Sequence, residues 1–189
     1  SFKNLFISEL KDYAKKFVDY RRSPIVQRSE SQAINEQDML PAYPVTVFLS
    51  EAGWIRSAKG HDIDAENLNF RAGDQYLSHA QGKSNQRVYV LDEAGRSYAL
   101  AINSLPSARG MGEPLSSKLA PANGIGFKQV FIADDDAELI VVSNKGYGFK
   151  TQAKQLDTSA KAGKAFLSLA EGAFALDLQT VDGATHLAV

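Results

Sequence analysis

The chain has 189 residues and a formal net charge of −1, with 44% hydrophobic and 23% charged residues. This is an ordinary globular composition, so it excludes a disordered or collagen-like chain. The absence of cysteine excludes disulfide scaffolds, cysteine–zinc sites and thiol catalysis. No apolar run reaches the ~18 residues that a membrane-spanning helix needs, so we expect no membrane insertion.

The N-terminal residues place apolar side chains at steps of three and four, from Phe2 to Phe17. This period predicts an amphipathic helix over residues 1–22. Ser23-Pro24 ends the helix, because the residue before a proline is disfavoured in helical conformation. The polar residues 23–43 are predicted to be a linker. Since no starting methionine or secretory leader is present, we expect a fragment of a longer protein.

From Pro44 the apolar period changes to two, which predicts β-hairpins with a glycine in each turn. The pattern occurs three times, in residues 45–57, 88–100 and 139–151, with turn glycines Gly53, Gly95 and Gly146. A second glycine follows each turn glycine after 17 to 20 residues, in a shared pattern of Leu, Gly, Leu-Ser and Ala: Gly73, Gly112 and Gly163. Residues 185–189 resemble the opening of a fourth hairpin.

Mostly extended repeats of roughly 40–50 residues are typical of propeller-like β architectures, in which neighbouring blades stack to complete a core. We therefore predict a mainly β domain over residues 44–189, with about three blades and part of a fourth. The single Trp54 follows the first turn, and we interpret it as a structural anchor of the first blade. Stacking on an exposed base is the alternative.

The sequence offers no self-contained active site. The three histidines, His61, His79 and His186, form no zinc-binding pattern. A nucleophile elbow, a P-loop and a dinucleotide fingerprint are also missing. The acidic run 134–136 lacks the glycine and terminal glutamate of a calcium loop. We therefore expect no catalytic residue, no metal ligand and no cofactor in this chain.

Basic residues, in contrast, recur at matching places of the repeats. Residues 143–170 alone carry five lysines and one acid, Asp157. A curved band of point charges suits phosphates and reads no sequence, whereas charges that only keep the protein soluble are the alternative. The ten predicted phosphate contacts are Arg56, Lys59, Arg71, Arg96, Arg109, Lys118, Lys145, Lys150, Lys161 and Lys164.

Several stretches resemble the A subunits of bacterial DNA topoisomerase IV, which are type IIA topoisomerases. Residues 10–26 resemble the end of the helix that leads out of the DNA-cleavage core. Residues 47–64, 96–119 and 143–151 are similar to the first three blades of the C-terminal domain. The gyrase Q-R-R-G-G-K-G box has at most a degenerate relative in residues 107–113, which favours topoisomerase IV over gyrase.

This resemblance implies a β-pinwheel, a propeller-like disc whose blades exchange strands and whose positive rim binds and bends duplex DNA. The implied role is to present a DNA segment to the cleavage core for decatenation and supercoil relaxation, in a cytoplasmic, nucleoid-associated protein or one peripheral at the inner membrane. The parent enzyme would use ATP, Mg²⁺ and the B subunit through regions outside this chain. The alternative function is a protein-interaction platform that docks a condensin-type chromosome-organising partner.

Overall fold

The computed structural model describes residues 2–17, 41–65 and 68–181. The chain divides into two units, Ser1–Ile34 and Asn35–Val189, which we describe separately. In the first unit, helix α1 (Phe2–Lys16) confirms the predicted N-terminal helix, and its predicted continuation to residue 22 lies outside the described residues. Its last turn carries Lys15 and Lys16, which suits the negative pole of the helix dipole.

The second unit consists of antiparallel sheets built on the three predicted hairpins. These are β1 (Pro44–Ser50) with β2 (Trp54–Lys59), β4 (Arg87–Asp92) with β5 (Arg96–Ala101), and β8 (Glu138–Val142) with β9 (Gly148–Gln152). The turn glycines have φ values of 77°, 77° and 80°. This left-handed conformation is open to glycine at little cost, which explains why each turn needs one.

Further strands complete each sheet. They are β3 (Tyr76–Lys83), β6 (Glu113–Pro114), β7 (Phe127–Phe131), β10 (Lys164–Ala165) and β11 (Gln179–Thr180). The strand orders are β3-β1-β2-β6, β10-β5-β4-β7 and β11-β8-β9. Short 3₁₀ helices lie between strands, namely η3 (Ile102–Ser104), η4 (Leu115–Ser117) and η5 (Ala153–Leu156). The predicted fourth hairpin at 185–189 lies outside the described residues.

Neighbouring repeats exchange strands. The two-residue strand β6 follows the second hairpin but pairs with β2 of the first, and β10 follows the third hairpin but pairs with β5 of the second. Gly112 and Gly163 immediately precede these strands, with φ values of 88° and 71°. A Cβ atom on Gly112 would lie 2.5 Å from the carbonyl oxygen of Ile55, so the exchanged segment approaches β2 more closely than any other residue could.

The first repeat differs from the predicted alignment. Residues 76–80 belong to β3, which pairs with β1, whereas the matching Leu-Ser stretch of the second repeat begins the 3₁₀ helix η4. The long strand β7 begins 15 residues after Gly112, but β3 begins only three residues after Gly73. The first repeat is therefore shorter after its second glycine, and the predicted equivalence of residues 68–80 beyond Gly73 is wrong.

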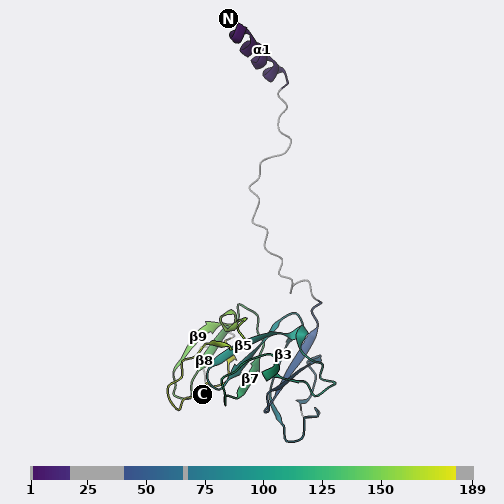
Figure 1. Ribbon diagram of the computed structural model, residues 1–189, viewed down its shortest axis with the longest axis vertical. Helices are drawn as coiled ribbons and strands as arrows, with labels where there is room; N and C mark the ends of the chain where they lie inside the picture. The colour runs from purple at the N-terminus through teal and green to yellow at the C-terminus, as the bar shows by residue number, and fades with distance from the viewer. Residues whose placement is uncertain (1, 18–40, 66–67, 182–189) are drawn as a thin grey trace. The chain divides into compact units, whose positions relative to one another are not determined.

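Two apolar cores lie between the sheets. Val88 and Val90 of β4 join the core shared with the first sheet, while Tyr89 and Leu91 of the same strand join the core shared with the third. The second sheet accordingly lies between the other two (Figure 1). A strand buried on both faces gives a continuous apolar run, and β4 shows such a run in the sequence Val-Tyr-Val-Leu.

Candidate nucleic-acid interface

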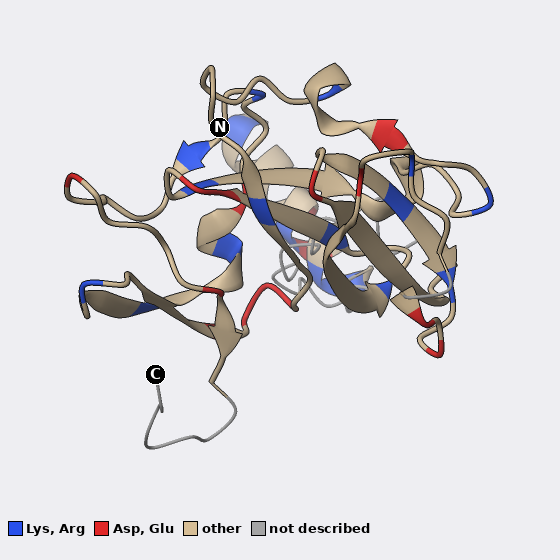
Figure 2. Ribbon diagram, turned by 90° about the horizontal axis from the view of Figure 1, so that it is seen from below, with Lys and Arg blue, Asp and Glu red and all other residues tan. Residues whose placement is uncertain are grey.

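The ten lysine and arginine residues predicted to contact phosphates do not share one environment. Lysines and arginines occur on the strands and on the loops around them, interspersed with acidic turns (Figure 2). A side chain can contact a phosphate only if its charged atoms reach solvent and are not already neutralised. Burial, hydrogen bonds and ion pairs therefore divide the ten bases into separate groups.

Arg56 corrects the prediction, because this residue is only 4% exposed. Its guanidinium donates hydrogen bonds of 2.9 Å to the carbonyl oxygens of Gly110 and Asn69 and lies 4.8 Å from the ring centroid of Phe70. Burial lowers the pKa of Arg56, and the nearby carboxylate of Asp74 partly opposes this shift. Arg56 thus joins β2 to two loops and has no place in a phosphate-binding band.

Asp74 is the acidic partner in this region. Burial alone would raise its pKa, but hydrogen bonds from Ser50 and from the backbone N–H groups of Ala52 and Gln75, with the charge of Arg56, leave it lowered. Ionised Asp74 therefore holds the first hairpin turn against residues 74–75.

Arg96 is also held by backbone groups. Its Nη1 atom donates to the carbonyl oxygens of Ala162 and Gly163, at 2.8 and 3.2 Å. These bonds fix the loop that leads into β10, so Arg96 repeats in the second blade the tethering role of Arg56. The residue is only half-buried, and part of its side chain still reaches the surface.

Three of the predicted bases have other local partners. Lys118 lies 3.4 Å from a carboxylate oxygen of Glu113, and Lys150 lies 4.0 Å from one of Glu138. Lys164 donates a 2.8 Å hydrogen bond to the carbonyl oxygen of Gln155. Exposed ion pairs of this kind are weak, about 0–1 kcal/mol, so a phosphate could still compete for these cations.

Lys59 and Arg109 meet at one groove of about 600 Å³ between the end of β2 and the segment 102–109. The Lys59 ammonium lies 4.8 Å from the ring centroid of Tyr43. Both bases are exposed, and neither forms an ion pair within the described residues. These two predicted residues are therefore brought together and left available.

Arg71 contacts the start of β2, at the other end of this strand from Lys59. Its guanidinium is 4.2 Å from the ring centroid of Trp54, beside a cavity of about 700 Å³ that Phe70 and Met111 also line. Trp54 is half-buried and pairs with Pro114 across the exchanged strand β6. These contacts agree with a structural role for Trp54.

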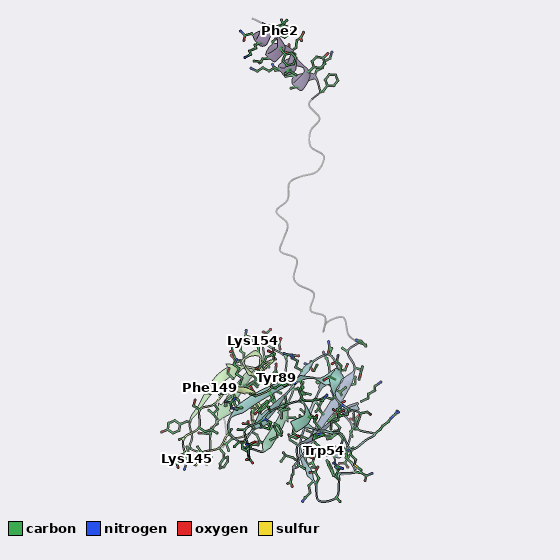
Figure 3. The ribbon with its side chains drawn as sticks, viewed as in Figure 1. Phe2, Trp54, Tyr89, Lys145, Phe149 and Lys154 are labelled. Carbon is green, nitrogen blue, oxygen red and sulfur yellow. The ribbon has the colours of Figure 1, made fainter. Side chains whose placement is uncertain are left out.

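The exposed bases Lys145 and Lys161 have no side-chain partner within the described residues. Lys145 lies in the turn between β8 and β9, and Lys154 lies in η5 at the other end of the same hairpin (Figure 3). Since Lys164 lies on β10 of the second sheet, the lysines of residues 143–170 are spread over two sheets and do not form one patch.

Sequence reasoning missed several polar residues near the available bases. Ser57, Asn103 and Ser107 line the groove of Lys59 and Arg109, but serine and asparagine are too common on surfaces to attract notice in a sequence. Exposed Lys83 at the end of β3 was also outside the predicted set. Arg87 and Lys128 would not have helped, since they pair with Asp157 and Asp177.

The described residues contain no group of three His, Asp or Glu side chains placed to hold a metal ion. Nε2 of His61 lies 2.9 Å from the carbonyl oxygen of Gly82, and Nδ1 of His79 lies 2.5 Å from the Tyr76 hydroxyl. His186 lies outside the described residues. Of the helices in the described part of the chain, none is long and apolar enough to cross a membrane.

Comparison with known proteins identifies the relatives of this chain. It is 51% identical over 170 residues to the A subunit of DNA topoisomerase 4 from Pseudomonas aeruginosa, a match that covers 90% of this chain and 22% of that protein. It is 49% identical over 185 residues to the same subunit of Haemophilus influenzae, covering 98% of this chain and 25% of the relative. The chain belongs to the family of DNA topoisomerase IV A subunits.

The chain thus spans about a quarter of the length of these relatives. A solved structure of the Escherichia coli ParC C-terminal domain superposes with a TM-score of 0.72 at 45% identity, covering 75% of this chain and 58% of that one. A C-terminal domain of DNA topoisomerase IV with 13% identity superposes with a TM-score of 0.61 and supports the fold alone. No protein-family model matches the chain. The predicted β-pinwheel is confirmed.

Proposed function

We propose that the β-pinwheel of this chain binds duplex DNA without sequence preference, bends it along the outer edge of the blades, and presents a segment to the cleavage core of topoisomerase IV. The observation that carries the proposal is that six of the ten predicted basic residues are exposed and have no acidic partner in the described residues. These six are Lys59, Arg71, Arg109, Lys145, Lys161 and Lys164.

Charges distributed over successive blades suit a bent duplex. Because neighbouring repeats exchange strands, Lys59, Arg71 and Arg109 lie beside the first sheet. Lys164 lies on β10 of the second sheet, with Lys161 three residues before it, and Lys145 lies in the hairpin turn of the third. Phosphate contacts made along such an arc can offset the energy of bending the DNA. Since each contact reads only the backbone, the binding should be nonspecific.

The wider role of the parent enzyme is part of the proposal. It comprises decatenation and supercoil relaxation with the B subunit in a heterotetramer, ATP and Mg²⁺ bound outside this chain, and a nucleoid-associated place in the cytoplasm. This chain contributes DNA binding and no catalytic residue.

The test is a gel-shift titration of the 189-residue chain with random duplex over a range of salt concentrations. Each neutralised phosphate adds about −0.9 to the slope of log K against log salt, so one contact from each of the six basic residues gives a slope of roughly −5. Equal affinity for unrelated sequences is expected. A chain that shows no shift at any salt concentration would contradict DNA binding. Fluorescence energy transfer between labelled duplex ends measures the bend separately.

A second candidate, a docking platform for a condensin-type chromosome-organising protein, is favoured by a different surface. Trp54, Phe70 and Met111 expose apolar atoms around one cavity, and Met111 is 49% exposed. Exposed apolar patches often mark protein–protein contacts. Replacing Met111 with the uncharged polar asparagine should weaken such docking and leave the DNA salt slope unchanged, because it adds no charge beside Arg71.

A further inference from the structure

The groove of Lys59 and Arg109 is a built feature of the first blade. It has a volume of about 600 Å³ and lies where β2 ends beside η3 and the following segment. Its apolar lining comes from Val45, Ile102 and Leu105, which also belong to the core between the first two sheets. A volume of this size admits a phosphate with part of its sugar but not the width of a duplex.

The polar lining of the groove consists of hydrogen-bond donors and positive charge. Lys59 and Arg109 supply the cations, and Ser57, Ser107 and Asn103 supply hydroxyl and amide groups. No aspartate or glutamate is among its described lining residues. Anionic oxygens accept charge-assisted hydrogen bonds from such donors, and the arginine fork matches a phosphate in two contacts.

The segment carrying Arg109 is fixed before any ligand arrives. The backbone N–H of Ser57 donates to the carbonyl oxygen of Pro106, and that of Ala108 donates to the carbonyl oxygen of Ser57, both at 2.8 Å. These two bonds tie the segment to β2. A preorganised loop loses little entropy on binding, which favours affinity for a small anionic group.

Lys59 is ordered from the other side. Its ammonium contacts the Tyr43 ring, and the backbone of Tyr43 exchanges hydrogen bonds with buried Ser84. The N–H of Tyr43 donates to Ser84 Oγ at 3.1 Å, and the N–H of Ser84 donates to the carbonyl oxygen of Tyr43 at 2.9 Å. Both cations of the groove therefore rest on fixed backbone.

The charges of this groove are not a by-product of the repeat. Lys59 stands six residues after the turn glycine, and Arg109 stands three residues before Gly112. The same positions of the next repeat are Ala101 and Ala160, which carry no charge. These two cations are thus particular to the first of the two blades, and the next blade carries its charge elsewhere, with Lys154 at the position of Asn103.

We propose that this groove is a phosphate-ester binding site that holds a backbone phosphate of the bound duplex and makes the first blade its anchor point. The assignment to DNA rests on the function proposed above, but the chemistry of the groove also suits the phosphate of a free nucleotide. The duplex would be anchored at this groove and would make weaker contacts with the lysines of the third blade.

The experiment compares Lys59→Ala, Arg109→Ala and the uncharged change Ser107→Ala with Lys145→Ala, an exposed base far from the groove in sequence. Removing either groove cation should lower the affinity for random duplex about tenfold, which corresponds to about 1.4 kcal/mol. Lys145→Ala should lower it less. Ser107→Ala should weaken binding about threefold without changing the salt slope, because it removes a hydrogen bond and no charge.

If a diffuse positive field attracts the DNA instead, Lys59→Ala, Arg109→Ala and Lys145→Ala should lower the affinity for random duplex equally. Ser107→Ala should then leave this affinity unchanged. That result would overturn the groove while leaving the proposed DNA binding in place. Circular dichroism and thermal unfolding establish that each variant is folded, as expected for exposed side chains.

A second arm separates the two sources of phosphate. Inorganic pyrophosphate is titrated into the ¹⁵N-labelled chain, and the amide signals of Ser107, Ala108 and Arg109 are followed by NMR. Shifts that disappear in the Lys59→Ala, Arg109→Ala double variant support the groove even if duplex fails to bind, in which case the proposed function fails and free phosphate esters are the ligands. Absence of shifts together with equal variant losses on DNA overturns the groove.

Discussion

The hydroxyl group of Tyr98 donates a 2.8 Å hydrogen bond to the Oδ2 atom of Asp92, and both residues are almost completely buried. The Oδ1 atom of Asp92 accepts a 2.8 Å hydrogen bond from the backbone N–H of Arg96. The carboxylate thus joins the second hairpin turn to the core. Three residues before the turn glycines of the other blades stand Ser50 and Ser143, so this arrangement is particular to the second blade.

Removing the Tyr98 hydroxyl should destabilise the domain. Tyr98→Phe leaves one buried carboxylate oxygen without its donor, and an unsatisfied buried group of this kind costs about 1–3 kcal/mol. Urea unfolding followed by circular dichroism measures the loss. Tyr147→Phe is the control, because Tyr147 is 78% exposed and should change nothing. Equal stabilities of the two variants would contradict a structural role for the pair.

The buried tyrosines also predict how stability changes at high pH. Burial, with the nearby charges of Asp157 and Asp135, raises the pKa of Tyr89 to about 12 despite the opposing charge of Arg87. The pKa of Tyr89 in the folded state is above the unfolded value of about 10. Protonated Tyr89 therefore contributes fully to the free energy of unfolding below pH 10, and this contribution is lost as the pH rises toward 12.

The free energy of unfolding should therefore fall between about pH 10 and 12, by roughly 3 kcal/mol through Tyr89 alone. Tyr89→Phe should make this fall smaller, although burial and the hydrogen bond to Asp92 also raise the pKa of Tyr98, which still contributes. Tyr147→Phe should keep the wild-type profile. Urea midpoints at half-unit pH steps provide the comparison. A Tyr89→Phe profile parallel to wild type would show that Tyr89 does not titrate in this way.

Gly112 gives a test of the strand exchange between blades. A side chain there meets the Ile55 carbonyl oxygen at 2.5 Å, whereas one at Gly124, with φ 79°, meets nothing within 4 Å. Both substitutions by alanine carry the cost of a left-handed conformation, about 1–2 kcal/mol. Gly112→Ala should lose about 1–3 kcal/mol more, the range for overpacking.

Thermal unfolding of the two glycine variants measures that difference. The N–H of Leu115 donates to the carbonyl oxygen of Gly53 and so joins the segment after β6 to the first hairpin turn. Amide hydrogen exchange at Leu115 therefore shows whether the loss of stability arises at this contact. If Gly112→Ala were no less stable than Gly124→Ala, close contact between β6 and β2 would not be important for the fold.

The hairpins could be predicted from sequence because their information is local. Alternating apolar residues and a glycine three or four residues after the strand specify each turn without reference to the rest of the chain, and residues 45–57 show both signals. The shortened first repeat could not be predicted, because Leu77-Ser78 has the same residues as Leu115-Ser116 but lies in β3, whereas Leu115-Ser116 begins η4.

The candidate site was harder to predict for a related reason. A basic residue is available or occupied according to which distant backbone lies beside it, and the carbonyl partners of Arg56 are 13 and 54 residues away along the chain. For Arg96 the separation is 66 and 67 residues. Lys59 and Arg109 likewise meet only because the segment after the second hairpin crosses to the first sheet.

Arg56 and Lys145 should give opposite results when replaced, and this contrast tests the division of the bases. Arg56→Met removes two charge-assisted hydrogen bonds from a buried guanidinium to backbone carbonyl oxygens, so it should lower the free energy of unfolding by about 3 kcal/mol. It should leave the salt slope of DNA binding unchanged wherever the variant is folded. Lys145→Ala should leave stability within about 0.5 kcal/mol and flatten the salt slope by up to about one unit.

Both variants are measured by urea unfolding and by a salt titration with the same random duplex at about 20 °C or below, where a weakened Arg56→Met domain has most chance to stay folded. Circular dichroism at each salt concentration identifies the folded fraction. If Arg56→Met kept its stability and flattened the slope, its guanidinium would have to leave the carbonyl oxygens of Gly110 and Asn69 to reach a phosphate. The loop between β2 and β3 would then be part of the DNA path, and Arg56 would be a phosphate contact despite its burial in the free protein.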